Sequence, residues 1–240
     1  MEISLDDLIL HLNDVFYSIQ GEGRFMGLPT LFFRFNRCNL SCKYCDTDFE
    51  TSNININTED FIQKIKSFML NYPIKQVCFT GGEPLLFIDD MIQILKTIKN
   101  SFDVKIETNG TIIPDKQIFY SHVTYFTITP KLEHSKLYDD SIPYWYSLAD
   151  RVSYKFMIDP YNVTFSIRLH EIYNFIMKHE LYSSGSQIFL SPINKDNRPE
   201  IVIETYKELV RKCVKHKDNR FFTIRFNGIT IQLHKILEFK

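Results

Sequence analysis

The sequence lacks the long apolar runs and the one-sided charge that would direct it to a membrane or to a polyanion. No stretch of about 18 or more apolar residues occurs, so no membrane-spanning helix is expected. The 28 basic and 29 acidic residues leave a formal net charge of -1, which gives no indication of nucleic-acid binding. The first residues, MEISLDDLILHLND, carry acidic side chains where a secretory signal carries lysines. We therefore expect a cytoplasmic protein that acts on a small molecule, with no nucleic acid and no membrane as partner.

Cysteine is scarce and unevenly placed. The chain has five cysteines in 240 residues, and three of them, Cys38, Cys42 and Cys45, fall within one short segment. An odd and clustered set argues against a disulfide framework and for a metal or reactive site. The other two lie in regular patterns, Cys78 in a strand and Cys213 in a helix, and we expect them to be buried small hydrophobic residues.

Hydrophobic patterning predicts an α/β fold, because short β-branched and aromatic runs alternate with amphipathic helical patterns. The predicted strands are 31–35, 76–79, 103–107, 123–128, 152–158, 187–190 and 220–226, and the predicted helices are 58–69, 89–100, 164–180 and 199–216. Such alternation implies right-handed crossovers and a parallel sheet, either doubly wound or rolled into a full or partial barrel. With 44% hydrophobic residues, residues 1–240 are expected to form a single domain.

Four short motifs stand where predicted strands end. They are GGEP (81–84), ETNGT (107–111), TPK (129–131) and SPIN (191–194). The C-terminal edge of a parallel sheet is where α/β proteins bind their ligands. The motifs therefore predict a ligand site at that edge.

The cysteine loop offers three ligands where a structural zinc site needs four. Cys38, Cys42 and Cys45 directly follow a predicted strand, and no further cysteine lies nearby in the sequence. Three thiolates on a four-iron cluster leave one iron open, as a cluster requires if it is to bind and reduce a substrate molecule. The pattern indicates an iron-sulfur site, with a structural zinc site or unrelated thiols as the alternatives.

The cysteine loop and the glycine motif together resemble the radical S-adenosylmethionine superfamily. Tyr44 stands before the last cysteine, where that superfamily usually has an aromatic residue, and GGEP (81–84) is similar to its glycine-rich motif. Alone, GGEP is typical of an ordinary turn between a strand and a helix. The resemblance implies a partial (β/α)6-type barrel with parallel strands, a 4Fe-4S cluster on Cys38, Cys42 and Cys45, and S-adenosylmethionine as the source of a 5′-deoxyadenosyl radical.

Within that superfamily the chain resembles the 7-carboxy-7-deazaguanine synthase family over most of its length. The segment FYSIQGEG (16–23) is similar to that family's SxQGEG signature, and QLHK (232–235) matches near the C-terminus. Two departures are visible. Thr129 stands where the family often has Ser, which keeps the hydroxyl, and the ending EFK (238–240) puts a role for the C-terminal carboxylate in question.

The resemblance implies a ring contraction of 6-carboxy-5,6,7,8-tetrahydropterin to 7-carboxy-7-deazaguanine, a precursor of deazapurine nucleosides such as queuosine. Hydrogen abstraction from C6 would start the rearrangement, ammonia would leave, and S-adenosylmethionine would be regenerated. The resemblance also implies Mg²⁺, a flavodoxin-like or other electron donor and a homodimer. A short N-terminal substrate-binding segment and a C-terminal extension would flank the core.

The same resemblance assigns site residues. It places S-adenosylmethionine at Tyr44, Gly82, Glu83, Thr129, Pro130, Lys131 and Ser191. It places the substrate at Ile19, Gln20, Gly21, Glu22, Arg34 and Thr80, and Mg²⁺ at Thr47. The planar fork of an arginine such as Arg34 suits the substrate carboxylate, and a carboxylate such as Glu22 suits the donors of a pterin edge. The simpler alternatives are a surface arginine in a strand at Arg34, a solvated charge at Lys131 and a structural histidine at His234.

Two other functions stay open. An activase that installs a glycyl radical on a partner protein would share the cysteine loop but would not need the QGEG segment. A metal-binding module without catalysis would bind zinc through the same cysteines.

Overall fold

The computed structural model describes residues 9–45, 54–98, 102–114, 121–216 and 227–239. The chain divides into two compact units. The first unit comprises Met1–Ser18, Leu28–Thr108 and Ile112–Phe126, and the second unit comprises Ile19–Gly27, Asn109–Thr111 and Thr127–Lys240. Among the helices in the described part of the chain, none has both the length and the apolarity needed to cross a membrane.

The first unit is built on strands in the order β3-β1-β2-β4-β5. Their bounds are β1 (Ile9–Ile19), β2 (Pro29–Phe35), β3 (Ile54–Asn57), β4 (Gln76–Gly81) and β5 (Asp103–Thr108). Strands β2, β4 and β5 are parallel, whereas β3 pairs with β1 in the antiparallel direction. The register pairs Arg34 with Thr80, and Cys78 with both Phe32 and Lys105. Because paired residues and alternate residues share a face, these five side chains lie on one face of the sheet.

The opposite face of the first unit's sheet carries an aromatic core under two helices, α1 (Thr58–Asn71) and α2 (Ile88–Ile98), the latter preceded by the short 3-10 segment η3 (Pro84–Phe87). Asn57 caps α1, because its side chain accepts a hydrogen bond from the Asp60 backbone N–H at 2.8 Å. Phe33 of β2 packs on Phe61 of α1 with 4.3 Å between ring centroids, and both side chains are fully buried. Burial of large aromatic side chains stabilises this unit through the apolar area removed from water.

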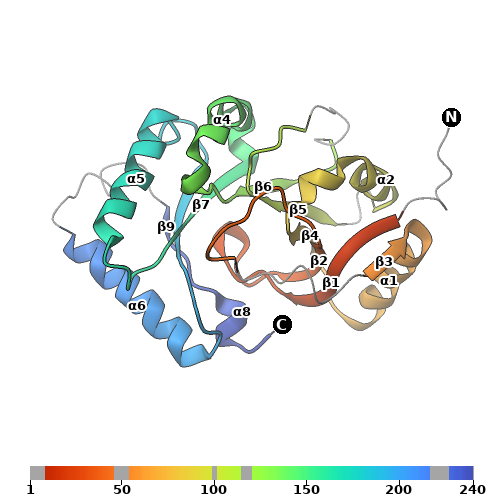
Figure 1. The fold of residues 1–240 in the computed structure, drawn as a ribbon. Helices are drawn as coiled ribbons and strands as arrows, with labels where there is room; N and C mark the ends of the chain where they lie inside the picture. The colour runs from red at the N-terminus through yellow and green to blue at the C-terminus, as the bar shows by residue number, and fades with distance from the viewer. Residues whose placement is uncertain (1–8, 46–53, 99–101, 115–120, 217–226, 240) are drawn as a thin grey trace. The chain divides into compact units, whose positions relative to one another are not determined.

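The second unit carries the parallel strands β7 (Val152–Ile158), β8 (Gln187–Pro192) and β9 (Gly228–Ile229). Its helices are α4 (Tyr138–Tyr146), α5 (Phe165–Lys178), α6 (Pro199–Lys215) and α8 (Leu233–Ile236), with the 3-10 segments η2 (Gly23–Phe25), η4 (Leu132–Leu137) and η5 (Ala149–Arg151). Helix α5 packs on β7 and α6 packs on β8 (Figure 1). The division between the two units passes through β6 (Tyr125–Ile128).

Two buried aromatic residues of α4 hold the turn that follows β5. Tyr138 Oη donates to the Asn109 carbonyl at 2.9 Å, and Trp145 Nε1 donates to the Gly110 carbonyl at 2.9 Å. Both aromatic side chains are fully buried, so these hydrogen bonds are formed away from water, where an unpaired carbonyl would be costly. These two hydrogen bonds hold the backbone of Asn109 and Gly110 in the ETNGT motif.

The predicted α/β alternation with mostly parallel strands is confirmed. The predicted strands from 31–35 to 187–190 and the predicted helices correspond to observed elements, with ends shifted by a few residues. The predicted strand at 220–226 lies outside the described residues, as does the end of the predicted helix 89–100. Strands β1 and β3 and helix α4 were not predicted, and α4 contains Pro143, which weakens its helical pattern.

Candidate functional site

The cysteine loop follows β2 directly and is organised by its own backbone. The Cys45 backbone N–H donates to the Cys42 carbonyl at 3.1 Å, which closes a tight turn around the last two cysteines. The Leu40 backbone N–H lies 3.4 Å from Cys38 Sγ. Cys38 and Cys42 are half-buried and Cys45 is exposed. Backbone donation to sulfur favours the thiolate form, which is the form that binds iron.

The glycine motif is packed against the start of this loop. The Gly82 backbone N–H donates to the Phe35 carbonyl at 3.0 Å, and the Glu83 N–H donates to the Arg37 carbonyl at 2.6 Å. A Cβ atom at Gly82 would lie 1.8 Å from the Arg37 carbonyl oxygen. Only glycine permits this approach, so GGEP and the segment that leads into Cys38 are held together.

Glu83 is a buried carboxylate with partners on two elements. Its Oε1 accepts from the Leu85 backbone N–H at 3.0 Å and from Thr108 Oγ1 at 2.7 Å. The side chain is fully buried, so an ionised carboxylate here requires hydrogen bonds of this kind. Glu83 therefore caps η3 and links the end of β4 to the end of β5.

A cluster of polar side chains occupies one face of β2, β4 and β5. Thr80 Oγ1 donates to Glu107 Oε2 at 3.2 Å, and Lys105 Nζ donates to Glu107 Oε1 at 2.8 Å. Arg34 lies beside them on β2, with its guanidinium carbon 5.1 Å from the centroid of the Phe16 ring. Arg34 and Thr80 were predicted to belong to the site, whereas Lys105 and the role of Glu107 were not. The available signal was the alternation in DVKIE (103–107), which places Lys105 and Glu107 on the same face of the strand.

In the second unit, the QGEG segment is buried and anchored. Glu22 is 8% exposed, and its Oε1 accepts from Ser191 Oγ at 2.8 Å. Its other oxygen forms an ion pair with Lys155 of β7. Gln20 Nε2 donates to the Glu22 carbonyl at 3.3 Å. The structure thus joins Glu22, predicted to bind the substrate, to Ser191, predicted to bind S-adenosylmethionine, and adds Lys155, which sequence analysis missed.

The end of the chain is tied to the same segment. The Leu233 backbone N–H donates to the Gly21 carbonyl at 3.0 Å. A Cβ atom at Gly21 would lie 1.7 Å from His234 Nδ1, so the imidazole packs directly on the Gly21 backbone. Asn194 Nδ2 donates to Gln232 Oε1 at 2.6 Å, which links the SPIN and QLHK motifs.

The TPK motif follows β6 and is fixed through α4. The Lys131 backbone N–H donates to Tyr138 Oη at 2.8 Å, and the same hydroxyl donates to the Asn109 carbonyl. Thr129 and Lys131 are half-buried and Pro130 is buried. Ile19, at the end of β1, is half-buried, as is Tyr44 in the cysteine loop.

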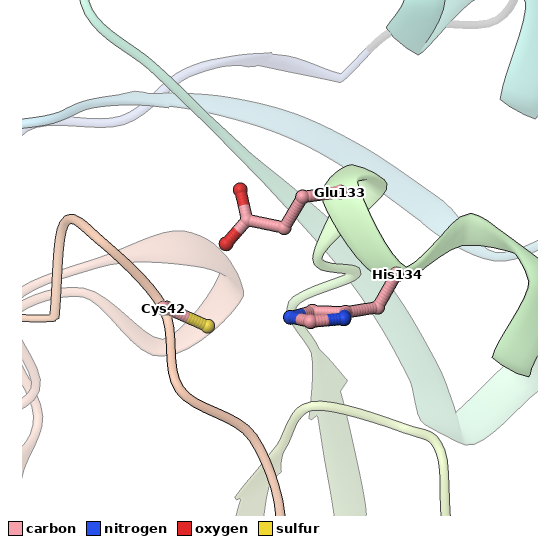
Figure 2. A group of neighbouring side chains, drawn as sticks. All are labelled: Cys42, Glu133 and His134. Atoms are coloured by element: carbon pink, nitrogen blue, oxygen red, sulfur yellow. The ribbon is translucent and has the colours of Figure 1, made fainter.

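Figure 2 draws three side chains of metal-ligand type, Cys42 on the cysteine loop and Glu133 and His134 on η4. His134 Nε2 is buried and has no hydrogen-bond partner among the described residues. Cys42 belongs to the first unit and the other two to the second, so we assign no joint metal site to them. Thr47, assigned to Mg²⁺ from the sequence, lies outside the described residues.

The two remaining cysteines are buried, as predicted. Cys78 packs with Phe16 and Phe32 on the sheet face, and Cys213 lies inside α6 at 1% exposure. Burial raises the pKa of the Cys213 thiol to about 12, so this side chain stays a neutral thiol and does not serve as a thiolate ligand.

Comparison with known proteins gives consistent matches. The family model of the Radical SAM superfamily matches residues 33–130, which include the cysteine loop, the GGEP and ETNGT motifs and the first two residues of TPK. The 7-carboxy-7-deazaguanine synthase of Rickettsia prowazekii is 35% identical over 149 residues, which are 59% of this chain and 61% of that protein. The chain thus spans less than two thirds of that relative. The enzyme of the same name from Aquifex aeolicus is 26% identical over 98% of this chain and 96% of its own length.

The fold has a solved counterpart. The alignment with the crystal structure of QueE from Escherichia coli covers 96% of this chain and 100% of the QueE chain. The TM-score is 0.60 and the sequence identity is 19%. At this level of identity the likeness concerns the fold alone. It agrees with the α/β architecture of mostly parallel strands and with the radical S-adenosylmethionine fold expected from the sequence.

Proposed function

We propose that the chain is a radical S-adenosylmethionine enzyme that contracts the ring of 6-carboxy-5,6,7,8-tetrahydropterin to 7-carboxy-7-deazaguanine, with loss of ammonia. The match of residues 33–130 to the Radical SAM superfamily model supports the enzyme class. The names of the relatives support 7-carboxy-7-deazaguanine as the product. The observation that carries the proposal is the buried QGEG segment, in which Glu22 is held by Ser191 and Lys155. An activase that works on a protein partner has no use for such a segment.

The superfamily uses a 4Fe-4S cluster and S-adenosylmethionine, which together supply a 5′-deoxyadenosyl radical when bound. The chemistry of the cysteine loop fits the cluster, because three cysteines fall on one short loop and the Leu40 backbone N–H points at Cys38 Sγ. We assign the cluster to Cys38, Cys42 and Cys45. We assign S-adenosylmethionine to Tyr44, Gly82, Glu83, Thr129, Pro130, Lys131 and Ser191.

The chain's own residues provide recognition of the substrate. Arg34 offers two parallel N–H donors to the substrate carboxylate, and Thr80 stands next to it in the register of β2 and β4. Lys155 keeps Glu22 ionised, so Glu22 and the backbone of Ile19, Gln20 and Gly21 accept and donate hydrogen bonds at the pterin edge. Firm positioning matters because a primary alkyl radical abstracts from most C–H bonds within reach.

Further parts of the proposal follow the resemblance. We assign Mg²⁺ to Thr47, since magnesium takes few protein ligands and accepts oxygen donors from a substrate. A flavodoxin-like or other protein would supply the electron, and two copies would form a homodimer. The proposed compartment is the cytosol, where reducing conditions preserve thiolates.

A direct test is anaerobic reconstitution with iron and sulfide, followed by incubation with S-adenosylmethionine, a strong reductant and the carboxypterin. We expect a product with the mass and absorbance of 7-carboxy-7-deazaguanine. Glu22→Gln should lower kcat/KM roughly 100-fold, because it removes a charged acceptor from a buried site. Lys207→Met, in an exposed ion pair of α6, is the matched control and should leave the rate unchanged.

A protein that carries the cluster and forms no product would overturn the proposal. Full activity of Glu22→Gln toward a glycyl-radical partner would favour the activase. Zinc in place of iron, with no brown chromophore after anaerobic purification, would favour the metal-binding module.

A further inference from the structure

Lys105 is a buried cation in the middle of strand β5. Its side chain is 2% exposed, and the register places it beside Cys78, which packs with Phe16 and Phe32. Lysine is almost never fully buried unless it is paired. Within the described part of the chain, Glu107 on the same strand is the carboxylate that pairs with Lys105.

Glu107 is bound on both of its oxygens by the first unit. Lys105 Nζ donates to Oε1 at 2.8 Å, and Thr80 Oγ1 donates to Oε2 at 3.2 Å. The pair holds Glu107 ionised and aims it along the sheet face toward β4. Glu107 is 22% exposed, so it is the more open end of the pair.

Arg34 stands on the same face, two strands from Glu107, and its stem packs against Gly81. Its guanidinium lies over the Phe16 ring, and among the described residues it has no carboxylate partner. Adjacent strands are about 4.8 Å apart, so the backbones of Arg34 and Glu107 are separated by roughly 10 Å. The extended side chains of an arginine and a glutamate can bridge that distance.

We propose that Lys105 is a positioning residue that neutralises Glu107 and so leaves the Arg34 guanidinium available for an anionic ligand. The cluster of Arg34, Lys105 and Glu107 carries one excess positive charge, and that charge is located on Arg34. Without Lys105, Glu107 is a carboxylate without its neutralising cation on the same sheet face as Arg34, and it competes with the ligand. That the ligand is a pterin carboxylate rests on the proposed function, whereas the availability of Arg34 does not.

The test compares Lys105→Met, which keeps the length and removes the charge, with Lys105→Gln, which keeps a donor and removes the charge. Lys105→Arg keeps the charge, and Lys207→Met is the surface control. The first readout is the rate at which phenylglyoxal modifies Arg34 in the protein without cofactors, measured by peptide mass spectrometry. We expect both neutral variants to slow this reaction at least fivefold, and Lys105→Arg and Lys207→Met to leave it near the wild-type rate.

The second readout is binding of 6-carboxypterin and of pterin, which lacks the carboxylate, to the same proteins. The neutral variants should weaken 6-carboxypterin binding about tenfold and leave pterin binding unchanged. The double variant Lys105→Met with Glu107→Gln should restore both the Arg34 reaction rate and the binding of 6-carboxypterin, because the competing charge is gone. A structural role for Lys105 alone would give no such rescue.

Wild-type reactivity of Arg34 in a folded Lys105→Met or Lys105→Gln protein would overturn the proposal. Absence of rescue in the double variant would do the same. If the wild-type protein binds no 6-carboxypterin while Arg34 reactivity still follows Lys105, the proposed substrate is wrong and the role of Lys105 stands.

Discussion

Each of the two units contains a buried lysine-glutamate pair whose second carboxylate oxygen accepts from a hydroxyl. In the first unit Lys105 and Thr80 hold Glu107, and in the second unit Lys155 and Ser191 hold Glu22. The burial differs in an informative way. Lys105 is 2% exposed against 22% for Glu107, whereas Lys155 and Glu22 are 12% and 10% exposed.

The difference indicates what each pair does. The Glu107 carboxylate is partly accessible to water, so the pair does not depend on Lys105 alone for solvation, which suits the proposed role of Lys105 in controlling the charge presented to Arg34. The pair of Glu22 and Lys155 is more closed to water on its carboxylate side, and a buried ion that loses its counter-ion keeps its full desolvation cost. The first pair therefore suits the proposed role of tuning an anion site, and the second pair suits holding in place the QGEG segment that carries the proposed substrate contacts.

The largest effect is expected for Lys155→Met, which leaves Glu22 buried without its cation. We expect the free energy of unfolding to fall by about 3–5 kcal/mol, as when one partner of a buried ion pair is removed. Urea denaturation at neutral pH measures the loss. The loss should shrink as the pH falls, because protonation of Glu22 removes the uncompensated charge. A loss independent of pH would mean that Lys155 contributes through packing alone.

Gly82→Ala should come next, with a loss of about 3 kcal/mol, at the upper end of the cost of overpacking. The added Cβ would lie 1.8 Å from the Arg37 carbonyl oxygen, and the backbone that leads to Cys38 must move. Iron bound per chain after reconstitution should fall together with the stability. Gly21→Ala is the contrast, because its Cβ meets the side chain of His234, which can rotate away. It should leave the iron content unchanged.

Lys105→Met should cost less than Lys155→Met, about 2 kcal/mol, because Glu107 keeps its hydrogen bond to Thr80 and has access to water. Urea denaturation of the two variants under identical conditions gives the comparison directly. Equal losses would contradict the distinction drawn from burial and would assign both pairs a structural role.

The sequence predicted the helices and strands better than it predicted the two lysine-glutamate pairs. Aromatic and β-branched runs such as LFFRF (31–35) identified strands correctly because consecutive side chains of β2, which point to opposite faces of the sheet, are buried. Strand β1 was missed because Asn13 and Asp14 interrupt its pattern, although Asn13 is buried.

The lysines were missed for a physical reason. A lysine in a strand normally faces solvent, and Lys155 is separated from Glu22 by 133 residues. Lys105 and Glu107 are two residues apart on one strand, so their common face follows from strand periodicity. The burial of Lys105 does not follow from the periodicity, because it depends on what packs over this face of the sheet, where Cys78 beside Lys105 packs with Phe16 and Phe32.

The smallest effects come from the hydroxyls, which give the finest test of the comparison. Ser191→Ala leaves one oxygen of a closed carboxylate without its donor, and we expect a loss of about 1–2 kcal/mol in the free energy of unfolding. Thr80→Ala removes a hydrogen-bond donor from the Glu107 carboxylate, which water already reaches. The free energy of unfolding should therefore fall by only about 0.5 kcal/mol. The free energy of 6-carboxypterin binding should fall by more than this. Thr80→Val keeps the shape of threonine and serves as the matched variant. Any difference in stability between Thr80→Ala and Thr80→Val reports packing. If Thr80→Ala lowered the free energy of unfolding as much as Ser191→Ala, water would not replace the lost donor at Glu107. The two carboxylates would then be equally shielded from water.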